Sequence, residues 1–149
     1  MTANLQDSML RDNSPRIVGV DYGRKRVGLA VADPLRLFAQ PHGTYSPDEA
    51  VAVLRRLHET VGLAVIVVGW PLTLEGEEGE ATRFVQPYVN RLRNAFEGVE
   101  VVKWDERFTS EMAKQAIREA GRRRGRRQKG RVDTAAASII LQEYLDENA

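Results

Sequence analysis

The chain has 149 residues, of which 42% are hydrophobic and 29% charged, and its formal net charge is +1. These proportions are typical of a soluble globular protein with a real core, and no apolar run approaches the roughly 20 residues of a membrane-spanning helix. The absence of cysteine excludes disulfides, thiolate zinc sites and a cysteine nucleophile. We expect a flexible tail over residues 1–15, a single domain over residues 16–149 and a cytoplasmic location.

The charge is unevenly distributed along the chain. Residues 118–131 contain eight cations and one acid, a net charge of +7, so the rest of the chain sums to −6. A concentrated basic segment on an otherwise acidic protein indicates a polyanionic partner. Within this segment, the glycine- and arginine-rich residues 121–130 predict a loop without a fixed structure of its own.

The first predicted element is a β-hairpin. Residues 17–20 and 27–32 are apolar and rich in β-branched side chains. Gly23 and three cations lie between them, and Gly28 is the second residue of the later run, as expected of a tight turn. Asp21 stands where the first buried strand ends, and a carboxylate there is costly unless it is paired or holds a metal. On this segment alone, Asp21 is either a cap for turn amides or a metal ligand.

An edge strand and a helix are predicted next. Residues 35–45 predict a third strand, which its two prolines confine to an edge or to its ends. Residues 46–49, Ser-Pro-Asp-Glu, contain the cap, the first-turn proline and the capping-box acid of a helix that ends at Gly62. His58 lies within this helix, and we interpret it as a surface residue rather than a ligand.

The apolar run over residues 64–68 predicts a central parallel strand that is covered on both faces. The loop that follows carries the four acids Glu75, Glu77, Glu78 and Glu80. Such a run is either a cation site or, more often, a solvated loop. Glu75 lies nearest the strand end and is retained as a candidate assisting acid.

The second half of the chain predicts three helices and one strand. A helix over residues 82–96 contains Pro87, which predicts a kink or a later start of the regular helix. Residues 99–104 predict a fifth strand, and residues 109–121 predict a third helix with its caps. A last helix over residues 132–145 is rich in small residues, which suits close packing on a sheet.

This order of elements predicts an α/β fold with a mixed five-stranded sheet, in which three antiparallel strands are followed by parallel ones, and with helices on both faces. The strands at residues 17–20 and 64–68 should be central and parallel. Sites in such sheets lie beyond the carboxyl ends of the strands, where Asp21 and Glu106 both fall. Asp133, at the start of the last helix, is a third carboxylate within reach.

Three carboxylates without histidine or cysteine partners suit Mg²⁺ or Mn²⁺, which prefer oxygen ligands. Two such ions about 4 Å apart would activate water and stabilise the leaving oxygen of a phosphodiester. The basic segment would hold the polyanion. Each acid alone is as readily explained by a capped turn or a neighbouring ion pair, but together these features favour a metal-dependent nuclease.

Four ordered motifs resemble the YqgF family, also called RuvX, whose members are described as Holliday junction resolvases and pre-ribosomal RNA nucleases. The motifs are residues 19–23 continuing to 26–30 (GVDYG and RVGLA), residues 68–72 (VGWPL), residues 105–109 (DERFT), and residues 129–133 (KGRVD) with the alanines and aliphatic residues up to 141. The resemblance covers residues 16–145 and implies a ribonuclease H-like fold. It also implies that Asp21, Glu106 and Asp133 are the catalytic, metal-binding acids. Trp70 departs from the family, which usually has an aliphatic residue there.

Roles follow from the resemblance and from the chemistry. We expect Asp21 to bridge two metal ions, with Glu106 and Asp133 each holding one. Glu75 lies where the family often has an acid and would assist. The cations expected to contact phosphates are Arg24, Lys25, Arg107, Arg122, Arg123, Arg124, Arg126, Arg127, Lys129 and Arg131. An alternative for Arg107 is an ion pair with Asp105 or Glu106.

Two other functions stay open at this point. Asp-x-Gly followed by a basic turn also resembles the phosphate hairpin of actin and sugar kinases, although those proteins enclose the nucleotide between two such domains. A non-catalytic module that binds nucleic acid or ribosomes would need the arginine-rich loop but not the acids. A nuclease substrate could be branched DNA or the 5′ end of precursor 16S ribosomal RNA. A resolvase acting on a two-fold symmetric junction would be expected to form a homodimer.

Overall fold

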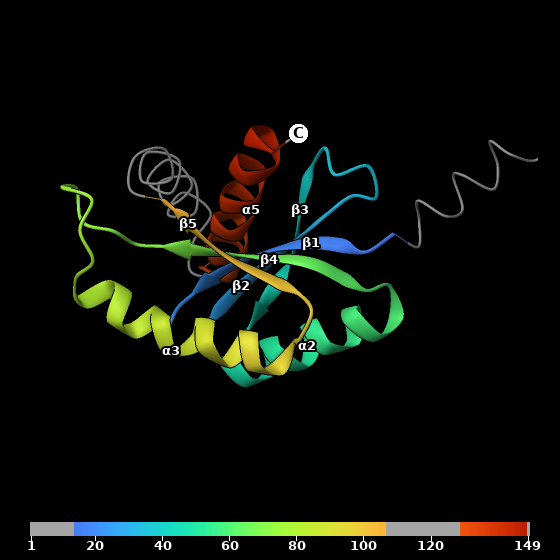
Figure 1. Ribbon diagram of the computed structural model, residues 1–149, viewed down its shortest axis with the longest axis horizontal. Coiled ribbons are helices and arrows are strands. Elements are labelled where there is room, and N and C mark those ends of the chain that lie inside the picture. The colour runs from blue at the N-terminus through green and yellow to red at the C-terminus, as the bar shows by residue number, and fades with distance from the viewer. Residues whose placement is uncertain (1–13, 107–128, 149) are drawn as a thin grey trace, which may run out of the picture.

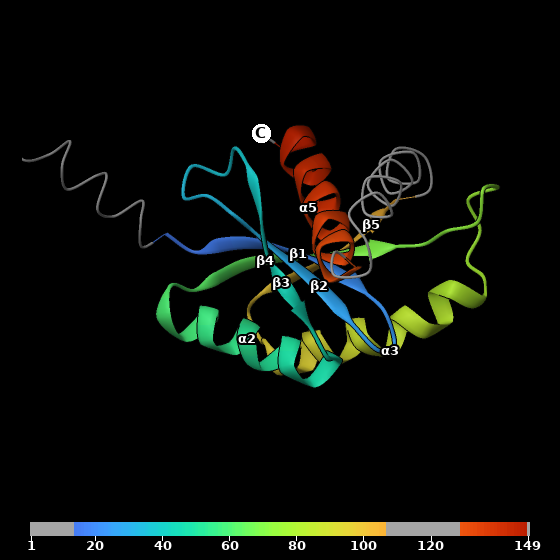
Figure 2. The ribbon, with the colours of Figure 1, turned by 180° about the vertical axis from the view of Figure 1, so that it is seen from behind.

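The computed structural model describes residues 14–106 and 129–148, and side chains are described for all of these except residues 129–134. One sheet carries helix α5 on one face and helices α2 and α3 on the other (Figures 1 and 2). The elements are β1 (Arg16–Tyr22), β2 (Val27–Ala32), β3 (Ala39–Tyr45), α2 (Pro47–Thr60), β4 (Leu63–Trp70), α3 (Glu80–Ala95), β5 (Glu100–Asp105) and α5 (Lys129–Glu147). None of the described helices is long and apolar enough to span a bilayer.

The strands lie in the order β3-β2-β1-β4-β5. Strand β2 pairs antiparallel with both β1 and β3, whereas β4 pairs parallel with both β1 and β5. The predicted mixed sheet, with the first and fourth strands central and parallel, is therefore confirmed. Strands β1, β4 and β5 end together at one side of the sheet, which we call the carboxyl edge.

Two hydrophobic clusters attach the helices to the sheet. The cluster beneath α2 and α3 includes Val18, Val20, Val68, Leu54 and Leu92, and the cluster beneath α5 includes Ile17, Val67, Ala137, Ile140 and Leu141. Because successive side chains of a strand point to opposite faces, odd-numbered positions of β1 and β4 face α5. In β5 the even-numbered positions face α5, since Trp104 packs in that cluster.

Helix α5 approaches the sheet closely at Gly19. A Cβ atom on Gly19 would lie 2.7 Å from the Cβ of Leu141 and 2.8 Å from the carbonyl oxygen of Ala137. The absence of a side chain at this position thus fixes how near the helix can lie. The predicted start of this helix, at residue 132, is wrong by three residues, because the backbone is already helical at Lys129.

The third strand was predicted to begin at residue 35, and this is also wrong, since β3 begins at Ala39. The Oδ1 atom of Asp33 accepts hydrogen bonds from the backbone N–H groups of Leu37 and Phe38, both at 2.7 Å. These bonds close a turn in which Arg36 has a φ of 59°. The apolar residues that resembled a strand belong to this turn.

The predicted start of α2 is confirmed in detail. Ser46 Oγ accepts from the N–H of Glu49, and a Glu49 carboxylate oxygen accepts from the N–H of Ser46. His58 lies exposed on this helix, and its Nδ1 accepts the N–H of Leu63 at 3.0 Å. The imidazole therefore serves the connection between α2 and β4.

Helix α3 begins at Glu80 and runs through Pro87, so the suggested later start is wrong. Its first turn is closed by Thr82, whose Oγ1 accepts from the N–H of Gly79 at 3.0 Å. The predicted helix over residues 109–121, most of the loop over residues 121–130 and the tail up to residue 13 lie outside the described residues.

Candidate active site

Asp21 and Glu106 lie at the carboxyl edge, on the face that α5 covers. Asp21 is an odd-numbered position of β1, paired with Gly28 of β2. Glu106 directly follows β5, and its backbone N–H lies 3.4 Å from the carbonyl oxygen of Trp70. Both acids are half-buried. Their strands are separated by β4, so two strand spacings of about 5 Å lie between their backbones.

Gly69 of β4 makes it possible for the Glu106 carboxylate to cross this gap. A Cβ atom on Gly69 would overlap Oε2 of Glu106 and would lie 2.7 Å from Cδ1 of Ile140. The carboxylate thus rests over the bare backbone of β4, and its Oε2 atom is buried. Val20 pairs with Val68, and continuing this register by one residue sets Asp21 beside Gly69. The Glu106 carboxylate therefore lies over β4, next to the strand position of Asp21.

Asp133 is the fifth residue of α5, and its side chain is outside the described part. Helical spacing puts position 133 on the same face as Ala137 and Leu141, four and eight residues further along. Because that face packs over Gly19 of β1, position 133 is on the sheet side of the helix. With only two of the three carboxylates described, residues 14–106 and 135–148 contain no cluster of three metal-ligating side chains.

Glu75 is exposed on the loop between β4 and α3. This loop extends beyond the sheet (Figure 1) and is held by Thr73, which accepts from Gly76 N–H and donates its own N–H to Glu77. Across the residues described, Glu75 forms no hydrogen bond or ion pair. Its assisting role stays a prediction.

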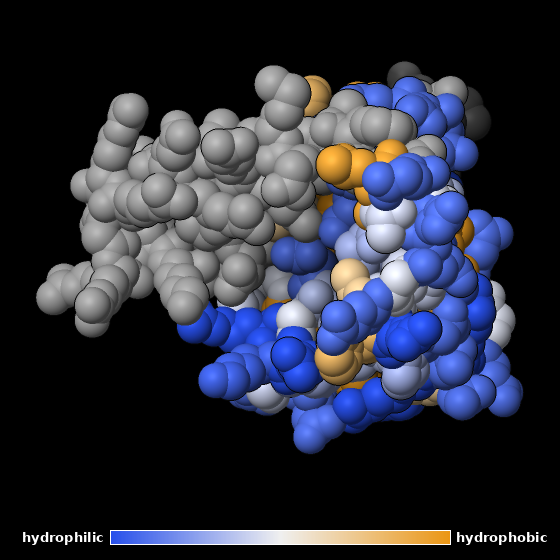
Figure 3. Space-filling model, turned by 90° about the vertical axis from the view of Figure 1, so that its left-hand side faces the viewer, coloured by the Kyte–Doolittle hydropathy of each residue, from blue (hydrophilic) through white to orange (hydrophobic). Residues whose placement is uncertain are grey.

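The predicted phosphate-binding cations are described only in part. Arg24 and Lys25 are exposed in the hairpin turn between β1 and β2, and the Arg24 guanidinium lies 4.3 Å from the ring centroid of Phe84 in α3. Lys129 and Arg131 belong to the first turn of α5, without described side chains. Outside the described residues are Arg107, Arg122, Arg123, Arg124, Arg126 and Arg127. Seen from the side of the β4–α3 loop, the described surface is largely hydrophilic (Figure 3).

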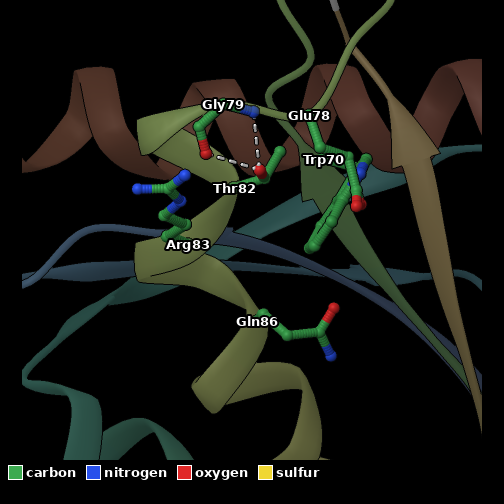
Figure 4. Close-up of a pocket in the computed structure, with 6 residues that line it drawn as sticks. All are labelled: Trp70, Glu78, Gly79, Thr82, Arg83 and Gln86. Carbon is green, nitrogen blue, oxygen red and sulfur yellow. Dashed lines mark hydrogen bonds between the residues drawn. The ribbon is translucent and has the colours of Figure 1, made fainter.

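A hollow of about 260 Å³ between α3 and the end of β4 was not anticipated from the sequence (Figure 4). Its lining comprises Trp70, Glu78, Gly79, Thr82, Arg83 and Gln86. Lys103 Nζ donates to Gln86 Oε1 at 2.6 Å and lies 4.0 Å from a ring centroid of Trp70. Gln86 also donates to Asn90, so its amide is already committed within the protein. The sequence offered only a weak signal for this hollow: a lysine, Lys103, within one predicted strand and a tryptophan, Trp70, just after another.

This chain, with its mixed sheet and one helix over the face that carries two strand-end acids, is similar to known proteins in sequence and in fold. A family model described as "RuvX: Holliday junction resolvase" matches residues 15–147. The chain belongs to the RuvX family. A relative from Salinibacter ruber named "Putative pre-16S rRNA nuclease" is 62% identical over 132 residues, which are 88% of this chain and 92% of the relative. A relative of the same name from Chlorobaculum tepidum is 42% identical over 142 residues, which are 95% of this chain and 100% of the relative.

Solved structures support the same fold. The RuvX chain superposes on T. thermophilus RuvC, solved in complex with a Holliday junction substrate, with a TM-score of 0.53 and 13% sequence identity. The match covers 91% of this chain and 98% of RuvC. The predicted ribonuclease H-like fold is confirmed. This RuvX protein is a nuclease, as the family and its relatives indicate.

Proposed function

We propose that this nuclease hydrolyses phosphodiester bonds with Mg²⁺ or Mn²⁺ held by Asp21, Glu106 and Asp133. The observation that carries the proposal is the Glu106 carboxylate, which is laid over the bare backbone of Gly69 beside the position of Asp21. A strand-end carboxylate that merely capped a turn would not need a glycine on the neighbouring strand to receive it.

The residues present fit a pair of hard divalent cations. The donors are carboxylate oxygens, which Mg²⁺ and Mn²⁺ prefer. Any side chain at position 69 would fill the space that the Glu106 carboxylate occupies. Bound ions would lower the pKa of a water nucleophile and stabilise the charge on the leaving oxygen. Asp21, from the central strand β1, would contribute to holding both ions, and Glu106 and Asp133 would each contribute to holding one. Ile140 of α5, which is buried, packs beside this seat on the same face of the sheet.

Precursor 16S ribosomal RNA is the first proposed substrate, because the relatives from Salinibacter ruber and Chlorobaculum tepidum carry that name. The description of the family favours a second, the four-way DNA junction. In both cases the cations of the hairpin and of the arginine-rich loop would bind backbone phosphates, which positions a strand without reading its sequence. A junction resolvase would act as a homodimer, and the mass of the protein in solution with and without a junction tests this.

Activity should disappear in excess chelator and return with either Mg²⁺ or Mn²⁺, because only oxygen ligands are proposed for the ions. The measurement is cleavage of two labelled substrates, a four-way junction and an RNA spanning the 5′ end of 16S ribosomal RNA, by one purified preparation. The Asp21→Asn protein, purified in parallel, controls for contaminating nucleases. Full cleavage in chelator would contradict the metal site, and cleavage of one substrate alone would identify the physiological class.

A further inference from the structure

Arg24 is held in place by an aromatic ring. Its guanidinium carbon lies 4.3 Å from the ring centroid of Phe84, on the first turns of α3. Phe84 is one of the exposed large apolar side chains, with 40% of its surface accessible. Among residues 14–106 and 135–148, Arg24 forms neither a hydrogen bond nor an ion pair. The contact with Phe84 is therefore what restrains this cation in the described part of the protein.

The hairpin meets α3 at two successive levels. Closer to the sheet, the rings of Tyr22 and Tyr88 pack with centroids 4.6 Å apart, and Tyr88 donates its hydroxyl hydrogen to the carbonyl oxygen of Pro47 at 2.8 Å. Arg24 follows Tyr22 by two residues, and Phe84 precedes Tyr88 by one helical turn. The hairpin therefore contacts α3 twice. The Tyr22–Tyr88 pair lies nearer the sheet, and the Arg24–Phe84 pair lies further out, at the surface.

A guanidinium whose carbon lies over a ring can make that contact through its flat face alone. Its five N–H groups lie in the plane and point outward, where they can form two parallel bonds with a phosphate. We propose that Phe84 is a positioning residue, which holds Arg24 at the carboxyl edge so that its N–H groups bind a backbone phosphate of the substrate strand. This inference rests on the proposed function.

The position of Arg24 suits that task. It follows Asp21 by three residues, at most about 10 Å of chain, but its guanidinium is turned toward α3 and away from the face that α5 covers. The phosphate it binds is therefore a neighbouring one along the substrate strand rather than the one that is cut. Glu80 precedes Phe84 by one helical turn and is exposed, as is Glu78. Either acid would compete with the phosphate for a freely moving arginine. By holding the guanidinium before the substrate arrives, Phe84 removes that competition and part of the entropy cost of binding.

The inference is tested by a double-mutant cycle of nucleic-acid binding, measured in chelator so that no cleavage occurs. Phe84→Leu should weaken binding of a labelled four-way junction or structured RNA about two- to fivefold, the usual size of an exposed cation–π contact. Phe84→Trp should bind at least as tightly as wild type. The Arg24→Gln protein should lose about 0.9 of the salt-dependence slope on duplex DNA, and adding Phe84→Leu to it should weaken binding no further.

Lys25→Gln is the matched control, because it removes a neighbouring cation of the same turn that contacts no aromatic ring of the described residues. Its effect and that of Phe84→Leu should add. Phe84 is exposed and leucine is a good helix former, so the thermal midpoint of Phe84→Leu should equal that of wild type. Wild-type binding by Phe84→Leu, or an equal loss with and without Arg24, would overturn the inference while leaving the nuclease intact. Failure of the wild-type protein to bind nucleic acid would overturn the proposed function as well.

Discussion

The Asp21→Asn and Glu106→Gln variants should each cleave nucleic acid about a thousandfold more slowly than the wild-type protein while folding normally. Each replacement keeps the shape of the side chain and removes a charge that a divalent ion would need. Losing about 4 kcal/mol of transition-state stabilisation corresponds to that factor. Both acids are half-buried at the carboxyl edge and belong to neither hydrophobic cluster, so the effect on unfolding should be small.

Single-turnover cleavage with saturating protein is the measurement that isolates this effect from substrate binding. Asp105→Asn is the matched control, because Asp105 precedes Glu106 directly but lies on the other face of β5 and is exposed. It should cleave at nearly the wild-type rate. Binding by the two active-site variants should be unchanged or tighter, since a carboxylate no longer repels the phosphates. Wild-type rates for both variants would place the active site elsewhere.

Gly69→Ala should lower the cleavage rate about a hundredfold, through the displacement of a catalytic group by roughly 1 Å. The added Cβ would overlap Oε2 of Glu106 and press on Cδ1 of Ile140 at 2.7 Å. The carboxylate is the end of a flexible side chain and moves most easily, so its position is lost first. The cost in unfolding free energy should be about 1–3 kcal/mol, as for other overpacked cores.

Combining Gly69→Ala with Ile140→Val separates these two effects. Valine lacks the Cδ1 atom that the new Cβ would meet, so the double variant should regain part of the lost stability, measured by chemical unfolding. Its cleavage rate should stay low, since the overlap with Glu106 remains. Recovery of the rate together with the stability would show that Gly69 acts on packing and not on the position of the carboxylate.

The general place of the site could be predicted from the sequence because it follows from a rule of sheets. Asp21 falls at the end of the first predicted strand and Glu106 just after the fifth. Parallel strands end at one edge, so these two strand-end acids were expected on the same side of the sheet. The contact between Gly69 and Glu106 could not be predicted from local sequence patterns, because it joins residues of two neighbouring segments of the sheet that are far apart in the chain. A strand-interior glycine looks the same whether it marks a bulge or receives a side chain. The contact of Arg24 with Phe84, sixty residues away, is of the same kind.

The wrongly predicted starts of β3 and α5 each have a local cause. Asp33 satisfies two backbone N–H groups in the run before β3, and this turn competes with a strand that the apolar residues alone would favour. At α5, Gly130 and the surrounding charge suggested a loop, yet the first turn of a helix has few internal hydrogen bonds to lose and tolerates glycine there. The role of Asp133 stays a prediction.

Helix α5 is the last element of the chain, and it covers the face on which the acids lie. During synthesis, which proceeds from the amino end at about 5–20 residues per second, all five strands leave the ribosome before this helix does. Until it docks, Ile17 and Val67 stay in water and position 133 is absent from the carboxyl edge. Because the proposed metal site takes one of its three acids from α5, we expect cleavage to require that this helix has docked on the sheet.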